Sequence, residues 1–191
     1  DVLTKDFVSR IGLGFLVMLI CLIIFVRSVS GVIVPFVATL FGIGTVLGFT
    51  GLLNIPADSD MMSLPVLLGM ALSIGYALHY INAFKMHFRQ TGKRKQSVIE
   101  AVGESGWPIL FTVITTAVSL LSFLFASIRP MVWLGAVAAG VVLMVYIYVV
   151  LLIPIFLSFG KDKAPSLAET KGATKADLIF EGIGKKIVKH S

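Results

Sequence analysis

The sequence has little charge and almost no cysteine. Aspartate, glutamate, lysine and arginine make up 14% of its 191 residues, whereas 57% of the residues are hydrophobic. An ordinary soluble domain carries about 25% charged residues, so this composition excludes an ordinary soluble domain. The single cysteine, Cys21, excludes an intramolecular disulfide.

Motifs of soluble enzymes are also missing. The chain has no phosphate-binding loop, no Cys and His cluster with metal-ligand spacing, and no pairing of a nucleophile with a base. We therefore expect no enzymatic activity, no cofactor and no bound metal.

What the chain does contain is long apolar runs. A helix needs about 20 apolar residues to cross the roughly 30 Å of bilayer hydrocarbon. Five segments reach or approach this length: Phe7–Val26, Gly31–Leu53, Leu64–Phe84, Trp107–Ser127 and Met131–Phe159. The sequence therefore predicts an all-α fold, a polytopic membrane helix bundle with five transmembrane helices over residues 11–159.

The basic residues predict the orientation of this bundle. If the N-terminal end lies outside, thirteen of the sixteen lysines and arginines fall on the inner side, within Arg27, residues 85–106 and residues 160–191. The positive-inside rule favours this orientation. The net charge of +6 then reflects topology and contact with anionic lipids, and we expect no nucleic-acid partner.

Two segments outside the spans have amphipathic patterns. Ser97 to Glu100 matches a capping box, which predicts a helix on the inner membrane surface within residues 85–106. After a polar linker, residues 174–190 combine apolar positions with lysines, which predicts a second, basic interfacial helix. Residues 160–191 are thus expected to form a cytoplasmic linker and helix.

Polar side chains in the third and fourth spans are the candidate functional residues. The third span carries Ser73, Tyr76, His79 and Tyr80, and the fourth carries a second stripe at helical spacing. The second stripe includes Thr112, Thr115, Thr116 and Ser119. Lipid offers no hydrogen-bond partners, so these residues are expected to face other helices or a water-filled path.

Spacing alone leaves two interpretations of these stripes open. In the structural interpretation, the Ser and Thr hydroxyls form hydrogen bonds to the carbonyl four residues earlier or hold helices together. A polar path between the two helices is the functional interpretation. His79 is equally open, because it can exchange a proton near neutral pH or be anchored by a hydroxyl or carbonyl.

Small residues predict where helices approach closely. Gly44, Gly48 and Gly51 share one face of the second span, and Gly135 and Ala139 form a small-xxx-small pair on the fifth.

Several motifs together resemble the resistance–nodulation–division superfamily. They are Asn54-Ile-Pro56, Ile74-Gly-Tyr-Ala-Leu-His79, Gly103-Glu-Ser-Gly106, Thr112-Val-Ile-Thr-Thr116 and Leu152-Ile-Pro-Ile-Phe156. The order of these motifs is similar to their order in the MMPL-like branch of the superfamily, whose members export lipids and other hydrophobic molecules. Members of the superfamily have two halves, each with six spans and an extracytoplasmic domain.

By this resemblance the chain corresponds to spans two to six of one half. Residues 1–10 would be the return from the extracytoplasmic domain, and because the chain starts at Asp1 we expect it to be part of a longer polypeptide. The family's proton-carrying aspartate immediately precedes the tyrosine matched by Tyr76, but this chain has Gly75 there. The other half could supply the carboxylate, His79 could replace it, or proton coupling could be absent.

The sequence thus favours the membrane half of an exporter for lipids or hydrophobic molecules in a bacterial cytoplasmic (inner) membrane. Its proton or polar relay would comprise the eight residues of the two stripes. Its partners would be membrane lipids, a hydrophobic substrate, the second half and the extracytoplasmic domain. One alternative is a lipid-binding or scaffolding module similar to sterol-sensing domains, without proton coupling. Another is an unrelated five-span subunit of a larger complex.

Overall fold

The computed structural model describes residues 2–26, 29–55, 62–159 and 162. The described residues form five α-helices and a single short 3-10 helix, and they contain no strand. In chain order the elements are α1 (Val2–Val26), α2 (Val29–Leu52), α3 (Ser63–Thr91), α4 (Arg94–Leu121), η1 (Ser122–Phe125) and α5 (Arg129–Ser158). The predicted all-α bundle is confirmed.

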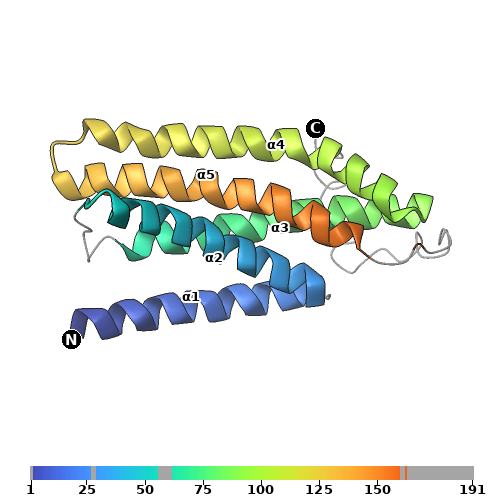
Figure 1. Ribbon diagram of the computed structural model, residues 1–191, viewed down its shortest axis with the longest axis horizontal. Coiled ribbons are helices and arrows are strands. Elements are labelled where there is room, and N and C mark those ends of the chain that lie inside the picture. The colour runs from blue at the N-terminus through green and yellow to red at the C-terminus, as the bar shows by residue number, and fades with distance from the viewer. Residues whose placement is uncertain (1, 27–28, 56–61, 160–161, 163–191) are drawn as a thin grey trace, which may run out of the picture.

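Successive helices run in opposite directions, so the bundle has two ends (Figure 1). We call them the Arg129 end, where η1 connects α4 to α5, and the Gly92 end, where α3 turns into α4. Four helices contain stretches long and apolar enough to cross a membrane, namely residues 32–52, 63–91, 94–125 and 129–158. Within α1 the described apolar stretch is the shorter Ile11–Cys21.

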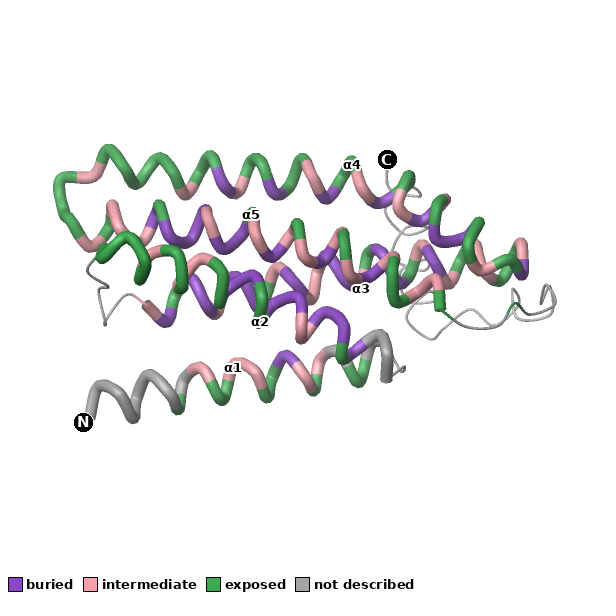
Figure 2. Tube along the Cα trace, in the orientation of Figure 1, coloured by how far each residue is buried: buried purple, intermediate pink, exposed green. Residues whose placement is uncertain are grey.

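Helix α5 lies at the centre of the bundle and contacts α2, α3 and α4. Its valines at positions 141, 142, 145 and 149 are fully buried. Figure 2 shows buried residues concentrated on α5, α3 and one side of α2, whereas α4 is exposed along its outer side. Helix α1 packs mainly against α3 and more lightly against α2. The core is therefore built around α5, and α4 presents a broad apolar surface outward.

Most of the glycines predicted to allow close helix approach do not do so, and one that was not predicted, Gly42, does. A Cβ atom added at Gly42 would lie 2.7 Å from Val145 Cγ2 and 2.9 Å from the Val145 backbone nitrogen. Gly135 is equally tight, 2.5 Å from the Leu120 carbonyl oxygen, as its predicted role in packing requires. By contrast, Gly44, Gly48 and Gly51 have no atom of the described bundle within 4 Å, so their predicted role in close packing is wrong.

The segment 85–106 is not a loop that carries a separate surface helix. Helix α3 continues to Thr91, and α4 starts at Arg94 and runs into the fourth span without a break. The predicted capping box is wrong, because Lys93 is the N-cap and the Ser97 hydroxyl donates to the Lys93 carbonyl oxygen at 2.7 Å. The amphipathic stretch is instead the first turns of α4. It packs Val98 and Ala101 against Phe84 of α3.

The connection between α3 and α4 needs only two residues. Gly92 caps α3 with φ of 68°, a left-handed conformation that costs glycine little. Arg94 then stacks over the rings of Phe84 and Phe88, 5.5 Å and 5.3 Å from their centroids. Its Nε donates to the Leu157 carbonyl oxygen at 2.8 Å. These contacts fix the Gly92 end of α3 and α4 against the end of α5.

Of the other predicted boundaries, two differ clearly: α1 begins at Val2 instead of Phe7, and α4 ends at Leu121 instead of Ser127, with η1 after it. The rest differ by at most two residues. The predicted basic helix at 174–190 lies outside the described residues, as does all of the predicted linker except Asp162.

Candidate functional site

Three of the four predicted polar residues of α3 face the interior of the bundle. Ser73, Tyr76 and Tyr80 are all buried. The Ser73 hydroxyl donates to the Pro35 carbonyl oxygen of α2 at 3.3 Å. That carbonyl also accepts a bond from Thr39 at 2.7 Å. Ser73 therefore joins α3 to α2.

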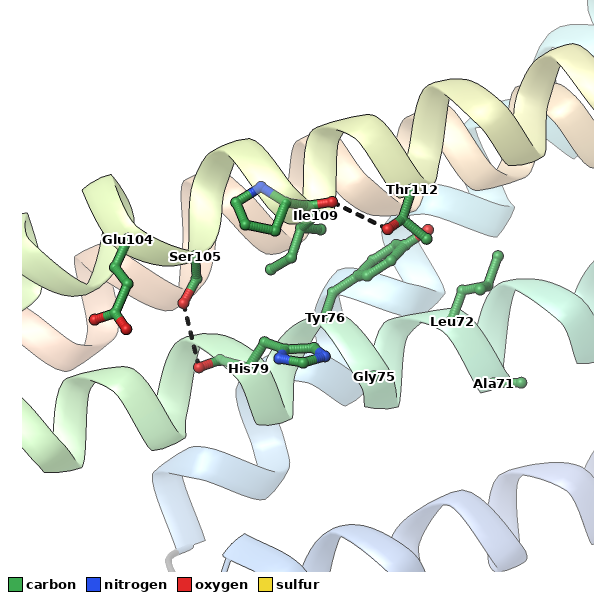
Figure 3. Close-up of a pocket in the computed structure, with 10 residues that line it drawn as sticks. Ala71, Leu72, Gly75, Tyr76, His79, Glu104, Ser105, Ile109 and Thr112 are labelled. Carbon is green, nitrogen blue, oxygen red and sulfur yellow. Dashed lines mark hydrogen bonds between the residues drawn. The ribbon is translucent and has the colours of Figure 1, made fainter. Parts of the chain in front are cut away.

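A pocket of about 570 Å³ lies between α3 and α4, and it is the candidate functional site. Figure 3 shows Tyr76, His79 and Gly75 on the α3 side, with Thr112, Ile109 and Ser105 on the α4 side. The Ser105 hydroxyl donates to the His79 carbonyl oxygen at 3.5 Å, which is at the limit of a hydrogen bond. The pocket thus combines polar groups from two adjacent helices within their apolar segments.

Two tyrosine hydroxyls near this pocket have no hydrogen-bond partner among the described residues. They belong to Tyr76 and Tyr80, which are 4% and 1% exposed. The ring of Tyr146 on α5 packs edge-on against Tyr76, with 6.1 Å between the centroids. A buried hydroxyl without a partner costs about 1 to 3 kcal/mol, and ordered water commonly removes this cost. These hydroxyls are therefore natural positions for bound water or a polar ligand.

His79 lies at the exposed side of the pocket. Its imidazole makes no hydrogen bond to a residue that the structure describes, so neither a hydroxyl nor a carbonyl of that part of the chain anchors it. The ring points into the space between α3 and α4 in Figure 3. An imidazole in this position can donate or accept a proton.

Only one member of the predicted α4 stripe reaches the pocket. Thr112 lines it, and its hydroxyl donates to the Pro108 carbonyl oxygen at 3.0 Å. Thr115, Thr116 and Ser119 lie on exposed or half-buried parts of α4 and bond carbonyl oxygens of their own helix at 2.7 to 3.0 Å. The geometry thus brings Thr112 together with Tyr76 and His79, but not the rest of the stripe.

Gly75 lines the pocket beside Tyr76. An added Cβ atom at this position has no neighbour within 4 Å. A side chain would therefore fit here, and the glycine is not needed for packing.

The sequence did not identify the carboxylate at the edge of this pocket. Glu104 lines the pocket, and its Oε2 lies 2.7 Å from Nε2 of His87, while Glu100 Oε2 lies 3.2 Å from Nδ1 of the same ring. These residues looked like parts of a loop, because a polar run between apolar spans gives no sign of an unbroken helix. Ser105 and Tyr146 were missed as well; for Tyr146 a hydroxyl among aliphatic residues was the only signal.

This arrangement can hold water and pass protons between hydroxyl and imidazole groups. It offers no metal site, since no group of three or more His, Cys, Asp or Glu side chains suits a metal ion in the described ranges. It also lacks a nucleophile paired with a base among those residues. Polar groups at membrane depth in a helix bundle commonly mark substrate pathways and proton relays.

Comparison with known proteins adds independent information. A family model described as the MMPL family matches residues 1–190. A protein of Methanocaldococcus jannaschii named as a membrane protein is 27% identical over 173 residues, which cover 90% of this chain and 44% of the relative. Membrane protein YdfJ of Bacillus subtilis is 28% identical over 134 residues, 69% of this chain and 18% of the relative. The chain therefore spans less than half of either relative, and no solved structure matches it.

Proposed function

The chain belongs to the MMPL family and is an integral membrane protein; from this premise we propose that it is the membrane half of a transporter for lipids or other hydrophobic molecules. In this proposal the protein is not an enzyme. It acts in the cytoplasmic membrane, with residues 85–106 and 160–191 on the inner side. Proton coupling runs through a second half, which together with an extracytoplasmic domain completes the transporter.

The pocket between α3 and α4 carries this proposal. Polar groups inside apolar helices are costly, and they usually mark the path of an ion, a proton or a substrate. Here Tyr76, His79 and Thr112 meet in one pocket instead of being scattered. The exposed face of α4 beside this pocket leaves room for a second half to cover it.

The length of the relatives supports a second half. The M. jannaschii relative is more than twice as long as the aligned segment, since the alignment covers 44% of it. In this proposal the second half contributes the carboxylate that Gly75 cannot supply. Protonation of that carboxylate then changes its interactions with Tyr76 and Thr112, and rocking of the bundle follows.

Flux in proteoliposomes tests the proposal. The full-length protein that contains this chain is reconstituted, and movement of a fluorescent phospholipid is recorded with and without a pH gradient. We expect gradient-dependent flux, and we expect Tyr76→Phe or Thr112→Val to slow it about tenfold or more, which is about 1.4 kcal/mol of barrier. Thr115→Val is the matched control, because Thr115 bonds carbonyls of its own helix as Thr112 does but does not line the pocket. Equal flux in Thr112→Val and Thr115→Val would contradict the role of the pocket.

A lipid-binding or scaffolding module without proton coupling is the second candidate. The observation that favours it is Gly75, which leaves this pocket without a carboxylate on α3. Such a module would show saturable lipid binding and no flux that responds to the pH gradient. The same proteoliposomes therefore distinguish the two candidates.

A further inference from the structure

A second hollow lies between α2 and α5, near the Arg129 end, and we call it the α2–α5 groove. Its volume is about 650 Å³, within the range of ligand pockets. Its walls are almost entirely apolar. The lining includes Phe49, Leu53, Trp133, Ala136, Gly140 and Met144. It is separate from the pocket between α3 and α4, so it needs its own explanation.

One cation stands at the end of this apolar groove. Arg129 lines it and is exposed, and no carboxylate of the described residues pairs with it. The carboxylates that the structure does pair, Glu100 and Glu104, bond His87 near the Gly92 end. An apolar trough with a positive charge at one end matches an amphiphile with a negatively charged head.

The dimensions of the groove fit an acyl chain. On α5 the lining runs from Arg129 to Met144, which is about 22 Å of helix at 1.5 Å per residue. One leaflet of a bilayer contributes about 15 Å of hydrocarbon. A chain lying in the groove thus extends from the membrane surface to the bilayer centre, while Arg129 stays at headgroup level.

From this juxtaposition we propose that the α2–α5 groove binds an anionic phospholipid, with its phosphate at Arg129 and one acyl chain along Trp133 and Ala136. A covering helix of the same protein is less suitable. An apolar helix would remove water from the guanidinium without supplying an anion, and that is costly. The inference is independent of transport through the other pocket.

Trp133 is a built-in reporter of this site. The sequence has two tryptophans, and Trp107 on α4 stacks on Phe111 outside the groove. In a Trp107→Phe background, Trp133 is the only tryptophan of the 191-residue chain. The chain is placed in nanodiscs, and fluorescence is measured against the mole fraction of phosphatidylglycerol or phosphatidylcholine carrying the same brominated acyl chains. Bromine quenches tryptophan on contact.

We expect phosphatidylglycerol to quench Trp133 at a mole fraction about fivefold lower than phosphatidylcholine does. This ratio corresponds to the attraction of about 1 kcal/mol between one basic residue and an anionic headgroup. Arg129→Gln should remove this difference, and Arg129→Lys should keep most of it. Ala136→Phe should fill the groove and weaken quenching by both lipids. Leu143→Phe is the matched control, because Leu143 is an exposed α5 residue outside the lining.

Three results would overturn the proposal. Equal quenching by the two lipids before any mutation of Arg129 would show that the groove contacts ordinary boundary lipid without selecting an anionic headgroup. No quenching by either lipid would show that protein covers the groove. A preference for phosphatidylglycerol that survives Arg129→Gln would place the selective site elsewhere.

Discussion

The packing of α2 on α5 makes a sharp prediction about two glycines that are two residues apart. At Gly42 an added Cβ atom would meet Cγ2 of Val145 at 2.7 Å and its backbone nitrogen and Cα at 2.9 Å. At Gly44 it would meet nothing within 4 Å. Ordinary carbon contacts lie at about 3.5 to 4.0 Å, so Gly42→Ala must push the two helices apart.

The expected magnitude follows from two opposing effects. Overpacking a tight contact costs about 1 to 3 kcal/mol, and the backbone of Val145 cannot rotate away as a flexible side chain would. Replacing glycine by alanine in a helix gains up to about 1 kcal/mol, which offsets part of this cost. Gly44→Ala receives the same gain without the clash. The difference in unfolding free energy between the two variants should therefore be about 1 to 3 kcal/mol, with Gly42→Ala the less stable.

The assay is reversible unfolding in mixed micelles titrated with sodium dodecyl sulfate and followed by far-ultraviolet circular dichroism. Helix propensity cancels in the comparison, so the difference reports the contact with α5. If the two variants unfold within about 0.5 kcal/mol of each other, the close approach of α2 to Val145 is refuted, since distant or open sites rarely differ by more.

Three further predictions concern hydrogen bonds and ion pairs. Thr45 Oγ1 and Tyr148 OH are 3.0 Å apart across α2 and α5; a Thr45→Val and Tyr148→Phe double-mutant cycle should give a coupling of about 0.6 kcal/mol, and zero coupling would count against the bond. Tyr80→Phe removes a buried hydroxyl without a described partner, so unfolding should show unchanged or higher stability, and a clear loss would reveal an unseen partner. Glu104→Gln weakens the contact with His87, and thermal unfolding should show a loss of only about 0.2 to 1 kcal/mol, because the carboxylate is exposed; a larger loss would contradict this.

The sequence was sufficient to predict the fold class but not the ends of every helix. An apolar run defines where hydrocarbon must lie, and four of the spans coincide closely with α2 to α5. It does not define where a helix stops outside the membrane. Helices α3 and α4 continue well beyond their apolar segments, because contacts such as Arg94 on Phe84 and the His87 pairs with Glu100 and Glu104 stabilise the extensions. Such contacts join residues on different helices, and helical spacing does not reveal them.

The burial of the predicted site residues could be inferred only where neighbouring residues on the same helix face indicated it. Tyr76 and Tyr80 share a face of α3 with Gly69, and these three residues are buried. Gly69 packs against Val141 of α5. Thr115 and Ser119 have the same helical spacing but lie on the exposed side of α4. A hydroxyl can satisfy itself on its own helix, so its presence in a span does not indicate which side faces the core. Only the packing of α4 against α3 and α5 distinguishes the two sides.

Gly75 connects these points to function. A glycine in a helix interior normally costs stability, and it persists either where a neighbour leaves no room or where function needs the space. Here nothing lies within 4 Å of an added Cβ atom, so packing does not explain it. The glycine does leave open the wall of the pocket next to Tyr76, whose hydroxyl has no described partner. A carboxylate contributed by another part of the proposed transporter would find space there, beside the buried Tyr76, which is the arrangement that the proposed two-half mechanism requires.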